Sequence, residues 1–115
     1  MILLVLSLLV VGQRQKHHVQ FGDGDVPELA RAIRAFGNAA EYIPAGLAAL
    51  GILAVVGAHY LIVHASGLTL LAGRLSHAIG LSRSTGSSGF RSVGMVLTWV
   101  AYILAAVGLL ISAFP

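Results

Sequence analysis

Hydrophobic and polar positions along this chain alternate in long blocks rather than residue by residue. Apolar segments are separated by short polar connections, a pattern that predicts helices over about 1–19, 26–57, 60–81 and 92–114. A helix needs roughly 20 residues to cross the hydrocarbon of a bilayer. The pattern therefore predicts an all-α integral membrane protein with a single domain over residues 1–115, built as a bundle of four transmembrane helices.

The first apolar segment is shorter than the others. Met1–Gly12 is too short to cross a bilayer alone, and it lacks the basic start and the small-residue cleavage site of a secretory signal peptide. We expect this helix to continue through Gln13–Val19 as a polar cytoplasmic extension. We also expect its natural start to lie before Met1.

The second helix has a clear start signal. Asp25 and Glu28 form an acidic variant of the capping box, and Pro27 falls in the first turn, where its missing N–H is not needed. Pro44 lies inside the same helix and removes one backbone hydrogen bond, so a kink is predicted there. A loop rich in Gly and Ser, Ser82–Ser92, precedes the last helix.

Composition agrees with a membrane protein. Hydrophobic residues make up 57% of the chain and charged residues 10%, whereas a soluble domain carries about 25% charged residues. The chain has no cysteine, which excludes disulfides, thiolate nucleophiles and thiolate metal sites within it.

The basic residues predict the orientation in the membrane. All seven lie near the first or the third connection: Arg14, Lys16, Arg31, Arg34, Arg74, Arg83 and Arg91. The second connection, around 57–60, has none. Cytoplasmic connections carry an excess of Lys and Arg. We therefore expect both basic connections on the cytoplasmic side of the inner or plasma membrane, and both termini outside.

A stripe of polar residues opens the second helix. Arg31, Arg34, Asn38 and Glu41 are spaced 3, 4 and 3 residues apart, which puts them on one helix face. Ionisable groups at membrane depth are costly and are tolerated where they face a protein interior or a wet cavity. Two interpretations stay open. One is a buried Arg–Glu pair with the asparagine bridging helices. The other is a cavity for a zwitterionic ligand, in which arginine binds a carboxylate, glutamate an ammonium group and asparagine an amide.

Two further places carry candidate chemistry. Arg74 and His77 lie one turn apart on the third helix. The remaining histidines show no pattern of partners, so no metal or haem site is expected. Arg91 opens the fourth helix. It is either an anchor to lipid phosphate or a cation at a helix N-terminus, where it would favour a thiolate or another developing anion.

The sequence around the polar stripe resembles a family motif. Residues 31–44, RAIRAFGNAAEYIP, are similar to the Arg-x-x-Arg-Ala-x-x-Asn-x-x-Glu-Tyr-x-Pro motif of the MAPEG family, the membrane-associated proteins of eicosanoid and glutathione metabolism. FGDGDVPEL, GRLSHAIG and GFRSVGM resemble the first loop and the later blocks of its bacterial members. The resemblance covers about residues 13–114.

The resemblance implies a four-helix membrane bundle that assembles as a homotrimer and binds glutathione as a co-substrate between protomers, on the cytoplasmic side. The positions that match glutathione-holding residues are Arg14, Arg34, Asn38, Glu41, Tyr42, Arg74 and His77. Arg91 matches the catalytic arginine that polarises the glutathione thiol in leukotriene C synthase and microsomal prostaglandin E synthase. Arg14 and Arg91 align only with gaps. Those enzymes carry a tyrosine where this chain has Leu81.

These observations lead to one function hypothesis and two alternatives. The hypothesis is a glutathione-binding membrane protein that acts as a glutathione transferase or peroxidase, activating the thiolate toward a lipophilic small molecule. The first alternative is a non-catalytic scaffold of the same fold that binds membrane lipid or a partner, which the leucine at position 81 favours. The second is a small four-helix multidrug exporter. Such exporters use one membrane glutamate and need no arginines beside it. No nucleic acid partner is expected.

Overall fold

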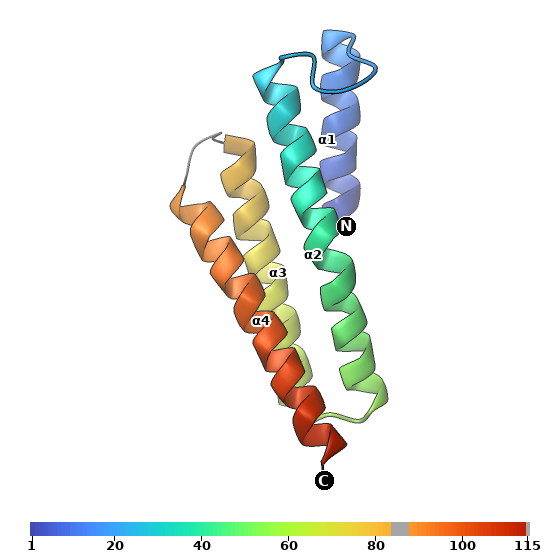
Figure 1. Cartoon of the computed structure of the whole chain (residues 1–115), viewed down its shortest axis with the longest axis vertical. Coiled ribbons are helices and arrows are strands. Elements are labelled where there is room, and N and C mark those ends of the chain that lie inside the picture. The colour runs from blue at the N-terminus through green and yellow to red at the C-terminus, as the bar shows by residue number, and fades with distance from the viewer. Residues whose placement is uncertain (84–87, 115) are drawn as a thin grey trace.

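The computed structural model describes residues 1–83 and 88–114 of the chain. These residues fold into helices and contain no strand, in the order α1 (Ile2–His17), α2 (Pro27–Val55), α3 (Tyr60–Arg83) and α4 (Gly89–Ala113). The helices run along the long axis of a narrow bundle of 56 × 26 × 17 Å (Figure 1). The all-α prediction is confirmed.

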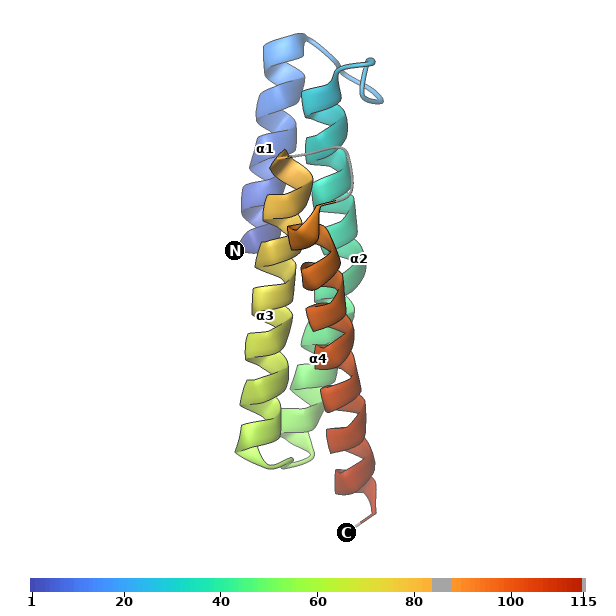
Figure 2. The same cartoon turned by 90° about the vertical axis from the view of Figure 1, so that its left-hand side faces the viewer.

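The helices pair unequally. α3 and α4 lie side by side over most of their lengths, and α2 packs against both (Figures 1 and 2). α1 packs against the N-terminal half of α2 and begins beside the middle of that helix (Figure 1). The ends of α1 and α3 and the starts of α2 and α4 share one end of the bundle. We call this the polar end, and the end formed by 53–62 and 108–114 the apolar end.

The start of α2 differs from the predicted capping box. Val26 is the N-cap residue, and its side chain accepts no hydrogen bond. Asp25 instead adopts a left-handed conformation, with φ 57°, and its N–H donates to Asp23 Oδ1 at 3.3 Å. Glu28 turns toward Arg31 rather than back to the cap. The Asp25–Glu28 capping box is therefore wrong, because the loop enters the helix through a residue that cannot accept such a bond.

The start of α4 lies earlier than expected, at Gly89. Ser88 is the N-cap residue, and its hydroxyl accepts a hydrogen bond from the N–H of Arg91 at 3.4 Å. This cap draws the last residues of the predicted loop, from Gly89 on, into the helix. Residues 84–87 of the predicted Gly- and Ser-rich loop lie outside the described residues.

Two glycines let α3 and α4 touch backbone to backbone. A Cβ atom added to Gly73 would lie 2.9 Å from the carbonyl oxygen of Gly94 and 2.9 Å from the backbone nitrogen of Thr98. A Cβ atom on Gly94 would lie 2.5 Å from the backbone nitrogen of His77. All three distances are shorter than Cβ contacts in proteins, so neither glycine has room for a side chain. Small residues at such positions are typical of packed membrane helices.

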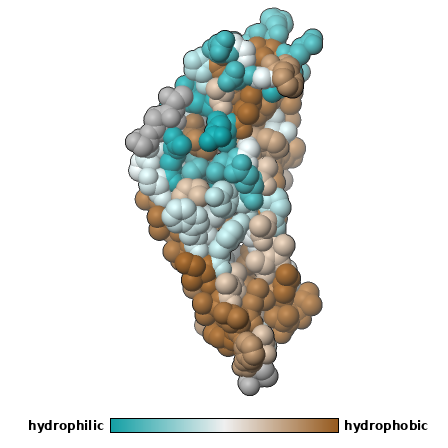
Figure 3. All heavy atoms as spheres, viewed as in Figure 1, coloured by the Kyte–Doolittle hydropathy of each residue, from teal (hydrophilic) through white to brown (hydrophobic). Residues whose placement is uncertain are grey.

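The outer surface of the bundle is apolar over much of its length. Leu61 and Ile103 are 57% and 61% exposed, and hydrophobic atoms dominate the apolar end (Figure 3). Among the described helices, α2 and α4 are long and apolar enough to cross a membrane, judged by length and composition. Exposed apolar surface of this extent fits a bilayer rather than water.

Candidate functional site

Hydrophilic side chains gather at and near the polar end, over the first half of α2 and the start of α4 (Figure 3). Two hollows lie there. The first, the α2 hollow, has a volume of about 170 Å³ and is lined by Ile33, Arg34, Gly37, Asn38 and Glu41. The second, the α4 hollow, has a volume of about 450 Å³ and is lined by His77, Arg91, Ser92, Met95, Val96 and Trp99.

The α2 hollow carries opposite charges along one helix face. Arg34 and Glu41 are exposed, and Asn38, between them, is half-buried. Neither charged residue forms an ion pair in the described part of the chain. The interpretation as a buried Arg–Glu pair therefore does not hold within one protomer, although Asn38 does bridge two helices, as that interpretation expected.

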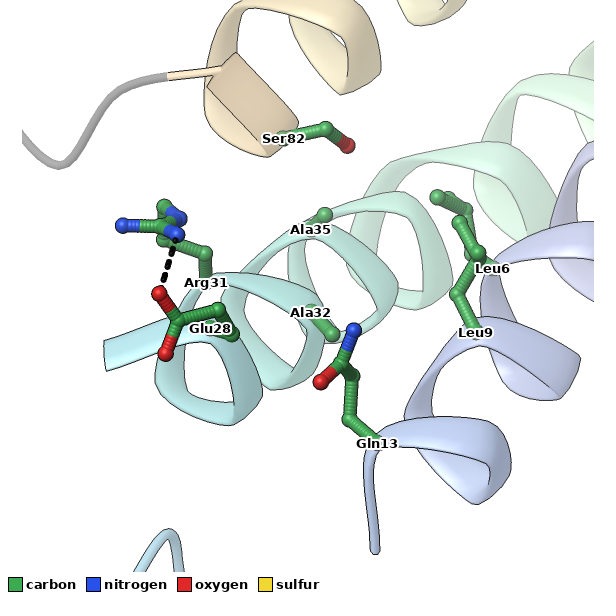
Figure 4. Close-up of a pocket in the computed structure, with 8 residues that line it drawn as sticks. All are labelled: Leu6, Leu9, Gln13, Glu28, Arg31, Ala32, Ala35 and Ser82. Atoms are coloured by element: carbon green, nitrogen blue, oxygen red, sulfur yellow. Dashed lines mark hydrogen bonds and ion pairs between the residues drawn. The ribbon is translucent and has the colours of Figure 1, made fainter. Parts of the chain in front are cut away.

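Arg31 leaves the predicted stripe. Its Nη2 lies 3.3 Å from Glu28 Oε1. Both residues line a third hollow of about 160 Å³ between α1, α2 and the end of α3, together with Leu6, Leu9, Gln13, Ala32, Ala35 and Ser82 (Figure 4). Ten residues of α-helix place Glu41 about 80° around the helix axis from Arg31. Arg31 and Glu41 thus lie at opposite edges of the face.

Arg74 lies deepest of the predicted site residues, with 2% of its surface exposed. Its Nη1 donates to Asn38 Oδ1 at 2.7 Å, and its Nε donates to Thr98 Oγ1 at 2.9 Å. Its Nη2 approaches the carbonyl oxygen of Gly94 at 3.5 Å and Met95 Sδ at 3.4 Å. The guanidinium therefore ties α3 to α2 on one side and to α4 on the other.

Tyr42 lies beside this guanidinium. The ring centroid of Tyr42 is 5.0 Å from Arg74 Cζ, within the range of a cation–π contact. The backbone carbonyl of Tyr42 accepts a hydrogen bond of 2.6 Å from the hydroxyl of Tyr102 on α4. Tyr42 thus joins the helix contacts around Arg74 and is not among the residues that line either hollow.

His77 and Arg91 connect α3 to α4 beside the α4 hollow. Nδ1 of His77 lies 3.0 Å from the backbone carbonyl oxygen of Arg91. A carbonyl oxygen only accepts, so Nδ1 carries the proton and Nε2 of the neutral ring is an acceptor. Arg91 is half-buried in the first turn of α4 and lines the α4 hollow. A cation here adds to the positive end of the helix dipole.

The remaining predicted positions lie apart from the two hollows. Arg14, near the end of α1, donates from Nη1 to the backbone carbonyl of Val19 at 3.4 Å. Leu81 is buried in an apolar cluster with Leu6, Ala35 and Ala39. The structure therefore brings Arg34, Asn38 and Glu41 together at one hollow and His77 and Arg91 at the other. Arg74 lines neither of these two hollows.

Two partners of Arg74 were missed by the sequence analysis, Thr98 and Met95. A signal existed for Thr98, because a hydroxyl in the apolar α4 segment needs a partner in the membrane. Its Oγ1 accepts from Arg74 and donates to the carbonyl of Gly94 at 2.8 Å. Within the described residues, no group of three or more His, Asp or Glu side chains could hold a metal ion.

Comparison with known proteins agrees with the membrane character of the chain. Residues 1–111 match the sequence profile of the MAPEG family. The chain is also similar to the inner membrane protein YecN of Escherichia coli, in strains K12 and O6:H1. Identity is 39% over 104 residues, which cover 90% of this chain and 78% of the relative. Together with the two long apolar helices, these similarities place the chain in a membrane.

Proposed function

The chain belongs to the MAPEG family, and on that premise we propose that it binds glutathione through the α2 hollow. The observation that carries this proposal is the arrangement of Arg34, Asn38 and Glu41 on one hollow, with the two charged residues exposed and of opposite sign. Glutathione has carboxylates, an ammonium group and amides, and these are the groups that such side chains bind.

The spacing of the charged residues suits a tripeptide. Arg34 and Glu41 are seven residues apart on α2, which corresponds to about 10 Å along the helix axis. An extended chain of three residues also spans about 10 Å. Arg34 would bind a carboxylate with its planar fork, and Glu41 would bind the ammonium group at the other end.

We assign the reacting sulfur to the α4 hollow. Arg91 supplies a positive charge there, and Val96 and Trp99 supply apolar surface. A thiol with a pKa of about 8.5 is mostly protonated at neutral pH, and a nearby cation favours the thiolate. The thiolate sulfur would form a bond to an electrophilic carbon, and the leaving group would depart with its electron pair. The lipophilic electrophile would arrive from the bilayer. With a peroxide instead, the sulfur would attack one oxygen and release the alcohol, and a second glutathione would convert the resulting sulfenic acid to the disulfide and water.

Assembly would bring the two hollows together. Exposed Arg34 and Glu41 on a membrane helix need cover. We propose a homotrimer, the number three being taken from the family, in which the α2 hollow of one protomer faces the α4 hollow of its neighbour. Cross-linking that yields only monomers or dimers would overturn this arrangement.

The polar end would face the cytoplasm and the C-terminus would lie outside, because all basic residues lie toward the polar end of the membrane-crossing helices. The N-terminus lies beside the middle of α2 (Figure 1). The native chain has no cysteine, so one introduced at Asp23 gives a clean label. It should react only with reagents that enter the cell, whereas a cysteine at Ala58 should react from outside. The reverse pattern would overturn the orientation.

A second candidate function, a non-catalytic scaffold, is supported by Leu81. The family enzymes have a tyrosine at this position, and here an apolar side chain packs in the core. Calorimetry with glutathione, followed by conjugation to 1-chloro-2,4-dinitrobenzene, separates the candidates. Binding with turnover supports the enzyme, and binding without turnover supports the scaffold. Absence of binding by the purified protein overturns the glutathione proposal.

A further inference from the structure

We propose that Arg74 is a positioning residue that fixes the side-chain amide of Asn38, so that Nδ2 faces the α2 hollow as a hydrogen-bond donor. A ligand in this hollow would then present an acceptor oxygen opposite Asn38. The inference rests on the proposed function in taking glutathione as the probe. It concerns which end of the Asn38 amide faces the ligand, which the family assignment does not specify.

The orientation of the Asn38 amide follows from the hydrogen-bond donors and acceptors that the two side chains carry. A guanidinium has five N–H donors and no acceptor, and an asparagine amide has one accepting oxygen and one donating nitrogen. The side-chain atom of Asn38 that lies 2.7 Å from Arg74 Nη1 is therefore the oxygen. Exchanging the two ends of the amide would put two donors in contact. Nδ2 consequently points away from Arg74.

Arg74 itself is held from several sides. Thr98, the carbonyl of Gly94, the sulfur of Met95 and the ring of Tyr42 all contact it. With 2% of its surface exposed, it does not present its guanidinium to either hollow. The contacts fix the guanidinium, and the guanidinium fixes Asn38. Arg74 thus acts on a ligand through the asparagine and not by touching it.

The consequence is an ordered pattern of groups along the α2 hollow. Arg34 and Asn38 present donors, and Glu41 presents an acceptor. A matching ligand carries acceptor oxygens for the first two positions and a donor group for the third. In glutathione, Asn38 would face a carbonyl or carboxylate oxygen and not a peptide N–H.

The variant Asn38→Asp tests this orientation by the sign of its effect. The carboxylate has the same shape and still accepts from Arg74, but an oxygen replaces the donor that faces the hollow. Glutathione affinity should fall about 10-fold or more, while the melting temperature stays unchanged or rises. If Asn38 offered its oxygen to the ligand, Asn38→Asp would bind glutathione equally well or more tightly, and this result would overturn the inference.

A double-mutant cycle tests whether Arg74 acts through Asn38. Arg74→Met should weaken glutathione binding about 10-fold, because the amide is released, and Arg74→Lys should restore most of the affinity. In an Asn38→Ala background, Arg74→Met should cause no further loss. Independent, multiplying losses would show that Arg74 touches the ligand directly. Arg83→Met, on the exposed end of the same helix, is the matched control and should bind as the wild type does.

Stability measurements keep the inference testable if the wild type does not bind glutathione or if Arg74→Met does not fold. Asn38→Asp should then keep the wild-type melting temperature, and Asn38→Leu, of similar size but without an acceptor, should lower it by several degrees. Equal losses in both variants would overturn the role of the Asn38 oxygen as the partner of Arg74. Absence of glutathione binding with unequal losses would overturn only the proposed function.

Discussion

The charged residues of α2 and those of the α3–α4 pair differ in whether their charges have partners within the protomer. On α2, Arg34 and Glu41 are exposed and form no ion pair in the described part of the chain. On α3, Arg74 is buried and donates to partners on two other helices. Exposed charge on a membrane helix calls for a ligand or a neighbouring protomer, whereas saturated buried charge holds helices together. Burial and partners, and not residue type, separate the two roles.

The largest loss of stability is expected from a substitution where α3 and α4 touch, because it would displace Arg74. Gly94→Ala adds a Cβ atom 2.5 Å from the backbone nitrogen of His77, so the helices must separate and Arg74 loses its position. We expect a loss of about 1–3 kcal/mol in the free energy of unfolding, measured by thermal or denaturant unfolding in detergent. Gly51→Ala is the control, because no atom lies within 4 Å of the added Cβ. Equal stability of the two variants would contradict the close packing.

Removing the exposed arginine of the α2 hollow should affect binding and not folding. Arg34→Ala removes a charge-assisted hydrogen bond worth roughly 1.5–3 kcal/mol, so glutathione affinity should fall about 10- to 150-fold. The melting temperature without ligand should stay within a degree or two of wild type, because the side chain is exposed within its own protomer and lines an open hollow. Calorimetric titration and thermal unfolding give both values. A large drop in stability would mean that Arg34 is a packing residue.

Arg91 should affect the sulfur and not the affinity. In Arg91→Ala, glutathione should still bind through the α2 hollow, but the pKa of its thiol in the complex should rise and turnover should fall. The thiolate absorbance of bound glutathione, followed against pH in wild type and variant, measures this directly. Coinciding curves with binding retained would identify Arg91 as a lipid anchor and favour the scaffold.

The smallest expected effect compares two hydroxyls with the same local bond. Thr98 and Ser112 both donate to the carbonyl oxygen four residues earlier, at 2.8 Å each. Thr98 also accepts from Arg74. Thr98→Val should therefore cost about 1 kcal/mol of stability, and Ser112→Ala close to nothing. A matching small effect at both positions would mean that Thr98 does not support the guanidinium.

Much of this picture could be predicted from the sequence, because it depends on local periodicity. Blocks of apolar residues indicated the helices, and the motif around Arg34, Asn38 and Glu41 gave a family that the comparisons confirm. The position of these three side chains on one hollow follows from helical spacing alone.

The burial of Arg74 and its hydrogen bonds to α2 and α4 could not be predicted in the same way. It depends on α4 approaching α3 through Gly73 and Gly94, a contact between segments about 20 residues apart in the chain. The predicted stripe also divided, since Arg31 turned to Glu28. Spacing gives the face of a helix, but the neighbour of each face is set by tertiary packing.

The glycine contact between α3 and α4 also bears on how the chain enters the membrane during synthesis. α4 is apolar enough to cross alone, whereas α3 carries Arg74 and His77 toward its end. The hydroxyl and carbonyl groups on α4 that accept from Arg74 are synthesised after α3. We therefore expect α3 and α4 to insert together as a helical hairpin. In this hairpin α4 supplies the hydrogen-bond acceptors that Arg74 of α3 needs inside the bilayer.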